Sequence, residues 1–223
     1  MSILSCIEIE PATAADSCVI WLHGLGASGH DFEPVVPELR LPADSAVRFV
    51  FPHAPSIPVT VNGGMVMPAW YDILDIALER RVDKDQLRRS AAAVQALIDR
   101  EIERGVDSRR IVIAGFSQGG AVGYEAALSF ERPLGGLLAL STYFATADSV
   151  ALADANRHLP VHVFHGSRDP MVPEQLGYQA TQVLKSMGLN PGYRTYPMEH
   201  AVCAEEIHDI AVCLHRWLGL TPA

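Results

Sequence analysis

The chain has 223 residues, 49% of them hydrophobic and 19% charged, and this composition fits one globular domain over residues 1–223. It excludes a disordered, a collagen-like or a coiled-coil chain. The 17 lysines and arginines against 26 acidic residues give a net charge of -9, which opposes binding to nucleic acid and to anionic membrane surfaces. The sequence therefore predicts no nucleic-acid partner.

Hydropathy and cysteine usage indicate the compartment. No stretch approaches 18 uninterrupted apolar residues, and residues 1–15 lack the basic and apolar regions of a secretory signal. We therefore expect a cytoplasmic protein without stable membrane insertion. The four cysteines, Cys6, Cys18, Cys203 and Cys213, form no C-x-x-C pair, and a chain of this length needs no disulfides to hold its core. We expect reduced thiols.

Apolar, β-branched runs alternate with amphipathic stretches along the chain. Residues 3–9 could add an edge strand, and the predicted strands after them cover residues 18–23, 47–51, 111–115, 136–141, 161–165 and 192–196. Helices are predicted over about residues 83–104 and 203–218, the first from apolar residues that recur every three or four positions. Residues 52–71 form a long connection without a clear pattern, and such loops are often functional.

This alternation predicts an α/β fold. We expect a mostly parallel sheet of about seven strands, with helices on both faces and right-handed crossovers. These elements use nearly all residues, so no cap domain is expected. Because ligands of such sheets bind beyond the carboxyl ends of the strands, the residues just after each strand are the candidate site.

One such segment contains a G-x-S-x-G pentapeptide, Gly115-Phe-Ser-Gln-Gly119, between a buried strand and a small-residue helix start. This is the context of a nucleophile elbow, in which a sharp turn exposes the serine oxygen. Gly115 and Gly119 remove side chains that would collide across the turn. Ser117 is therefore the candidate nucleophile, and the backbone N–H of Gln118 can stabilise negative charge on a substrate oxygen. The alternative is a merely structural turn.

A serine nucleophile needs an imidazole base and an acid that orients it. Asp169 lies in a turn just past the strand over residues 161–165, whereas the rivals Asp148 and Asp154 lie further from a strand end. His200 lies between the last strand and the last helix, so it is the candidate base. No H-E-x-x-H or H-x-x-E-H spacing occurs, and we expect neither a metal nor a cofactor.

A glycine-rich loop follows the strand over residues 18–23. Gly24, Gly26 and Gly29 let backbone amides face inward, and such a loop normally supplies a second oxyanion donor. We expect His23, at the strand end, to be an orienting group and not the base. The same glycines match G-x-G-x-x-G, so a phosphate loop is the competing interpretation. No acidic residue lies about 20 positions on after a second strand, and no G-K-[ST] occurs, which disfavours it.

Together these segments resemble the acyl-protein thioesterase, lysophospholipase and small carboxylesterase family of α/β hydrolases. The matching motifs, spread from Trp21 to Trp217, are His23-Gly-Leu-Gly26, Gly115-Phe-Ser-Gln-Gly-Gly120, His165-Gly-Ser-Arg-Asp169-Pro-Met-Val-Pro173 and Met198-Glu-His200. The resemblance implies an α/β-hydrolase fold and a triad of Ser117, Asp169 and His200. It also implies an oxyanion hole formed by the backbone N–H groups of Leu25 and Gln118. Ser28 departs from the family pattern, which often has an acidic residue there.

The connection over residues 52–71 is rich in apolar side chains. Met65, Met67 and Trp70 are the predicted substrate-binding residues, since they could line an acyl groove. The resemblance implies that this region shapes the acyl channel. The alternatives are packing against the fold or against a partner subunit, and an exposed apolar loop is compatible with a homodimer.

The sequence thus predicts a serine hydrolase that cleaves carboxylic esters or thioesters of short to medium acyl chains through an acyl-enzyme. The substrate could be a small-molecule ester, an acylated protein or a lysophospholipid. The alternative hypothesis is a ligand-binding protein built on a hydrolase scaffold, because a fold does not dictate a function.

Overall fold

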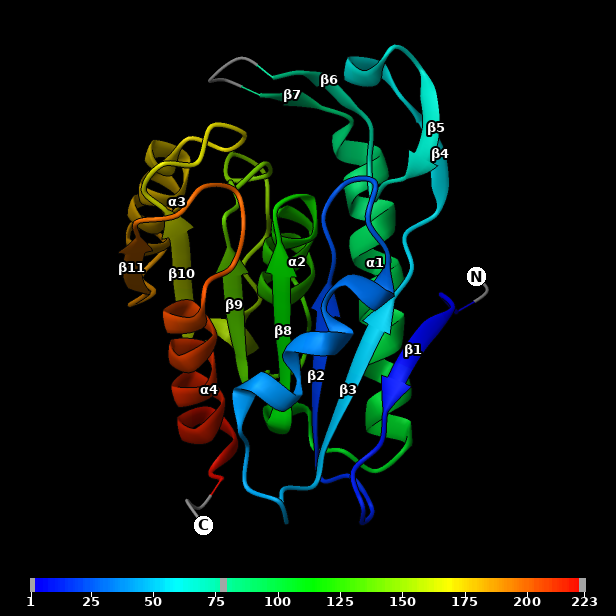
Figure 1. Cartoon of the computed structure of the whole chain (residues 1–223), viewed down its shortest axis with the longest axis vertical. Coiled ribbons are helices and arrows are strands. Elements are labelled where there is room, and N and C mark those ends of the chain that lie inside the picture. Colours follow the sequence, from blue (N-terminus) through cyan, green and yellow to red (C-terminus); the bar gives the residue numbers. More distant parts are fainter. Residues whose placement is uncertain (1–2, 77–79, 221–223) are drawn as a thin grey trace.

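The computed structural model describes residues 3–76 and 80–220, and within them a seven-stranded sheet forms the centre of the molecule (Figure 1). In spatial order its strands are β1 (Cys6–Ile9), β3 (Val47–Pro52), β2 (Ser17–Leu22), β8 (Ile111–Phe116), β9 (Gly136–Leu140), β10 (Val161–Gly166) and β11 (Gly192–Tyr196). β1 pairs antiparallel with β3, and every other neighbouring pair is parallel. This confirms the predicted sheet, including its edge strand.

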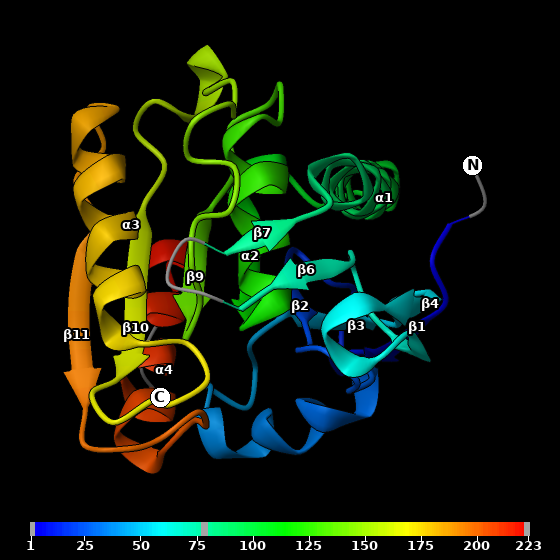
Figure 2. The ribbon, with the colours of Figure 1, turned by 90° about the horizontal axis from the view of Figure 1, so that it is seen from above.

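Helices cover both faces of the sheet (Figure 2). α1 (Lys84–Glu103), α2 (Gln118–Leu128) and α3 (Glu174–Ser186) pack on one face, while α4 (Ala204–Leu218) and three 3-10 turns within residues 29–39 pack on the other. Every residue of β2, β3 and β9 is buried, because strands that are apolar on both faces fit only between two helical layers.

α1 shows why the predicted helix forms where it does. The Asp83 carboxylate accepts a hydrogen bond from the backbone N–H of Gln86 at 2.8 Å, which caps the first turn. The apolar stripe then faces the sheet, with Leu87, Val94 and Ile98 fully buried. The cap thus sets where the helix starts, and the apolar stripe sets which face it buries.

Residues 52–71 are not an irregular connection, so that prediction is wrong. β4 (Ser56–Val59) and β5 (Met65–Pro68) form an antiparallel hairpin, in which Gly63 and Gly64 take the positive φ angles of 67° and 79° that its turn requires. Pro58 and Pro68 lie within these strands and hid the strand pattern, because proline is tolerated only at sheet edges. A second small sheet pairs β6 (Ile73–Asp75) with β7 (Arg81–Val82). Both lie beyond the carboxyl ends of the central strands (Figure 1).

The described part of the chain contains no helix that is both long enough and apolar enough to cross a bilayer. Its four cysteines are all free thiols, as the sequence predicts.

Candidate active site

Ser117 lies on a sharp turn between β8 and α2. Its backbone angles, φ 53° and ψ -119°, are strained for a residue with a side chain. The turn is held by the Ser117 N–H, which donates to the Leu140 carbonyl at 2.9 Å, and by the Thr142 hydroxyl, which donates to the Ser117 carbonyl at 2.6 Å. A Cβ atom on Gly119 would lie 2.5 Å from the Leu22 carbonyl oxygen, so this position requires glycine.

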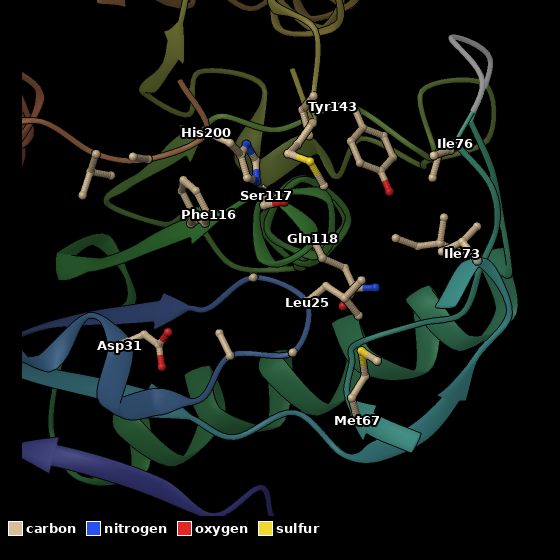
Figure 3. Close-up of a pocket in the computed structure, with 18 of the residues that line it drawn as sticks. Leu25, Asp31, Met67, Ile73, Ile76, Phe116, Ser117, Gln118, Tyr143 and His200 are labelled. Atoms are coloured by element: carbon tan, nitrogen blue, oxygen red, sulfur yellow. Dashed lines mark hydrogen bonds between the residues drawn. The ribbon is translucent and has the colours of Figure 1, made fainter. Parts of the chain in front are cut away.

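The three residues that the sequence singles out meet at one edge of the sheet, and Figure 3 shows the His200 ring beside Ser117. The His200 Nε2 lies 3.0 Å from the Ser117 Oγ, and the His200 Nδ1 lies 2.6 Å from the Asp169 Oδ2. They follow β8, β10 and β11, which are parallel strands of the same sheet, with β9 between β8 and β10, so their carboxyl ends lie at the same edge. The rival carboxylates lie elsewhere, since Asp148 binds the Lys84 ammonium and Asp154 binds the Arg157 guanidinium, each at 2.7 Å.

The Asp169 carboxylate is buried, and both of its oxygens have polar partners. Its Oδ1 accepts the backbone N–H groups of Met171 and Val172, both at 2.8 Å, and its Oδ2 faces His200. Burial raises the pKa of this carboxyl, but the hydrogen bonds from His200 and from those amides outweigh burial and lower the pKa below its usual value. The carboxylate is therefore ionised at neutral pH. It favours the His200 tautomer that carries a proton on Nδ1, which leaves Nε2 free to accept the proton of Ser117.

His23 holds the glycine-rich loop after β2. Its Nδ1 lies 2.7 Å from the Gly24 carbonyl oxygen, and its Nε2 accepts the backbone N–H of Ala54 at 3.1 Å. Burial lowers the pKa of His23, so its ring stays neutral, with the proton on Nδ1 that this pairing needs. The Trp70 indole N–H donates to the His23 carbonyl at 2.9 Å and fixes the loop from the other side.

Gln118 connects this loop region to the start of α2. Its side-chain oxygen accepts the Trp70 backbone N–H at 2.8 Å, and its amide nitrogen donates to the Tyr71 carbonyl at 2.7 Å. The backbone N–H groups of Leu25 and Gln118 stay available, because no backbone or side-chain hydrogen bond of the described residues uses the Leu25 amide and the first amide of a helix has no intrahelical partner. Sequence reasoning identified the Gln118 backbone but missed this side-chain role.

A cavity of about 720 Å³ opens above Ser117, and Leu25, Gln118 and His200 line it. Of the predicted substrate-binding residues, Met67 lines the cavity. Met65 is 64% exposed on the β4–β5 hairpin and does not line it, and the buried Trp70 supports the glycine-rich loop instead. The walls that sequence reasoning missed are mainly Ile73, Ile76, Arg80, Tyr143 and Met171. Of these, Tyr143 shares the signal used for Ser117, a position just after a buried strand.

A strained serine after a parallel strand, followed along the chain by an aspartate and a histidine at later strand ends, defines an α/β hydrolase. The chain belongs to the phospholipase/carboxylesterase family, whose model matches residues 5–218. It is a serine hydrolase of carboxylic esters or thioesters.

Known proteins similar to this chain support the family assignment. A relative from Neurospora crassa, named acyl-protein thioesterase 1, is 42% identical over 91% of this chain and 87% of its own length. A relative of the same name from Gibberella zeae is 38% identical over 93% of each chain. The crystal structure of Arabidopsis thaliana SOBER1 has a TM-score of 0.85 at 30% identity, over 91% of this chain and 99% of that one. Zea mays acyl-protein thioesterase 2 has a TM-score of 0.86 at 25% identity, over 96% and 99%.

The helix that follows the His200 loop buries an ionisable group. Glu206, in the first turn of α4, is fully buried, and within the described residues neither of its carboxyl oxygens has a hydrogen-bond partner of normal geometry. Burial raises the pKa of Glu206 to about 8, the nearby Cys203 amide lowers it less, and repulsion from Asp209 adds to the rise.

Glu206→Gln is expected to stabilise the protein more at pH 8 than at pH 5. The folded carboxyl, with a pKa of about 8, binds more protons than the unfolded one, with a pKa near 4.5, so its contribution to stability is lost as pH rises through this window. The expected gain in unfolding free energy grows from less than about 1 kcal/mol at pH 5 toward an upper limit of about 4 kcal/mol at pH 8. Urea unfolding at both pH values measures it, and an equal gain at both would contradict the prediction.

Proposed function

We propose that Ser117, Asp169 and His200 are a catalytic triad for the hydrolysis of short- to medium-chain esters and thioesters. The single observation that carries this proposal is the continuous contact from the buried Asp169 carboxylate through His200 to the Ser117 hydroxyl, at 2.6 Å and 3.0 Å. A serine hydroxyl is a weak nucleophile on its own, and this contact supplies the base that activates it.

The reaction follows from this geometry. His200 Nε2 takes the proton as the Ser117 Oγ attacks the acyl carbonyl, and the imidazolium is stabilised by the Asp169 carboxylate. The oxyanion is held by the amides of Leu25 and Gln118, both of which line the cavity. His200 then protonates the leaving alcohol or thiol. Water, activated by the same imidazole, hydrolyses the acyl-enzyme and regenerates Ser117.

The cavity supports an acyl substrate. Ile73, Ile76 and Tyr143 lie on one side of Ser117 and form an apolar wall, whereas the exposed carboxylate of Asp31 lies on the other side (Figure 3). The apolar wall suits the acyl chain. The relatives named acyl-protein thioesterase support a thioester among the substrates. The proposal places this enzyme in the cytoplasm, acting as one domain without a cofactor.

Labelling and turnover test this proposal together. A fluorophosphonate probe should modify Ser117, as identified by peptide mass spectrometry, because only an activated serine reacts readily. The protein should also turn over p-nitrophenyl butyrate and butyrylthiocholine, an oxygen ester and a thioester that share the butyryl group. Modification of a different residue, or ester binding without product release, would contradict the proposal, and the second result would favour a binding protein on a hydrolase scaffold.

A further inference from the structure

Arg80 stands between the cavity above Ser117 and a second cavity. Arg80 and Tyr143 line both of them. The second cavity, of about 190 Å³, is bounded beyond this pair mainly by Phe144 and by the α3 side chains Leu176 and Ala180. The two hollows are therefore neighbours, separated by one cationic and one aromatic side chain.

The Arg80 side chain is fixed in this position by contacts on both sides. It donates a hydrogen bond from Nη2 to the Met171 carbonyl, across 91 positions of sequence, and its guanidinium carbon lies 5.0 Å from the centre of the Tyr143 ring. Tyr143 is itself held, because its hydroxyl lies 2.7 Å from the buried Tyr71 hydroxyl. Arg80 and Tyr143 thus form a fixed partition between the two cavities, in which the arginine side chain does not rotate freely.

The chemistry of the partition opposes the passage of an acyl chain. The side of the first cavity that leads to it is apolar, with Ile73, Ile76 and Tyr143 as walls. Burial of a methylene chain against these apolar walls is favourable, but contact with the Arg80 guanidinium is not. If the chain displaced the guanidinium, that charged group would still need its polar partners. Within the described residues the Arg80 Nε is already buried without a hydrogen-bond partner, so displacing the guanidinium from the Met171 carbonyl would leave a second N–H unsatisfied.

We propose that Arg80 is a specificity-determining residue that ends the acyl-binding site and limits the length of the acyl chain. This inference rests on the proposed function, since it assigns the apolar side of the cavity to the acyl group. Removal of the side chain would join the two cavities and offer a longer chain the apolar face of α3. Each methylene that finds such a surface raises kcat/KM about fourfold.

The test compares p-nitrophenyl laurate with p-nitrophenyl butyrate in the full-length protein. In Arg80→Ala we expect the laurate-to-butyrate ratio of kcat/KM to rise by about tenfold or more, because several methylenes gain apolar contact. The ratio is the readout because it cancels any general change in activity that the substitution causes. The matched control is Arg81→Ala, which removes the exposed neighbouring arginine, lines neither cavity and should leave the ratio unchanged.

A second variant keeps the proposal testable if Arg80→Ala folds poorly. Gln179 is exposed and lines only the second cavity, so Gln179→Trp fills that cavity alone. In the wild-type background it should not change the ratio, and combined with Arg80→Ala it should abolish the gain. An unchanged ratio in a folded Arg80→Ala protein, or a lower ratio in Gln179→Trp alone, would overturn the inference. Butyrate turnover by the wild type tests the proposed function separately, so the two failures are distinguishable.

Discussion

Ser117→Ala is expected to lose about 10⁵- to 10⁶-fold in kcat for p-nitrophenyl butyrate, because the variant can form no acyl-enzyme. The loss is not complete, since the oxyanion donors and the bound geometry still accelerate attack by water about a thousandfold or more. The alanine needs no new space, and the glycines around the turn are unchanged, so the fold should persist. Stopped assays of kcat over long incubations measure the residual rate.

The control for this prediction is Ser129→Ala, at the far end of α2. The Ser129 hydroxyl donates to the Glu125 carbonyl at 2.6 Å and has no contact with the cavity. This variant should keep its kcat and its labelling by a fluorophosphonate, whereas Ser117→Ala should lose both. Turnover of Ser117→Ala within tenfold of the wild type would remove Ser117 from the mechanism.

The sequence allowed the central sheet and the candidate triad to be predicted because both depend on local patterns. A buried parallel strand is apolar on both faces, and the turn at Ser117 requires glycines at fixed offsets that are visible in the chain. Asp169 and His200 could be selected because each follows a strand, and parallel strands end at one edge. Asp148 has the same chemistry but binds Lys84, and only its distance from a strand end argued against it beforehand.

The walls of the cavity could not be predicted in the same way. Arg80 contacts Met171 from 91 positions away, and no periodicity or motif links the two segments. The apolar residues before Trp70 favour a substrate contact, but its indole N–H donates to the His23 carbonyl. Both contacts depend on how the small β-sheets lie over the central sheet. That arrangement is tertiary, and proline within the β4–β5 hairpin weakened even its local signal.

Asp169→Asn is expected to lower kcat by about 10⁴-fold with little effect on folding. The Asp169 Oδ1 accepts the backbone N–H groups of Met171 and Val172, so in the variant the side-chain oxygen must stay on that side. The new NH₂ group then faces the His200 Nδ1, where the carboxylate lay at 2.6 Å. A donor at this position favours the tautomer with the proton on Nε2, and that nitrogen can no longer accept the Ser117 proton.

The same argument predicts how the loss divides between the kinetic constants and how the turn survives. KM should change little, because Asp169 does not line the cavity, and the turn keeps its support from His165, whose Nε2 lies 2.8 Å from the Val172 carbonyl oxygen. Thermal unfolding should therefore stay near that of the wild type, while kcat collapses. Asp148→Asn is the matched control and should leave kcat unchanged. A loss of less than tenfold in a folded Asp169→Asn protein would mean that another group sets the tautomer of His200.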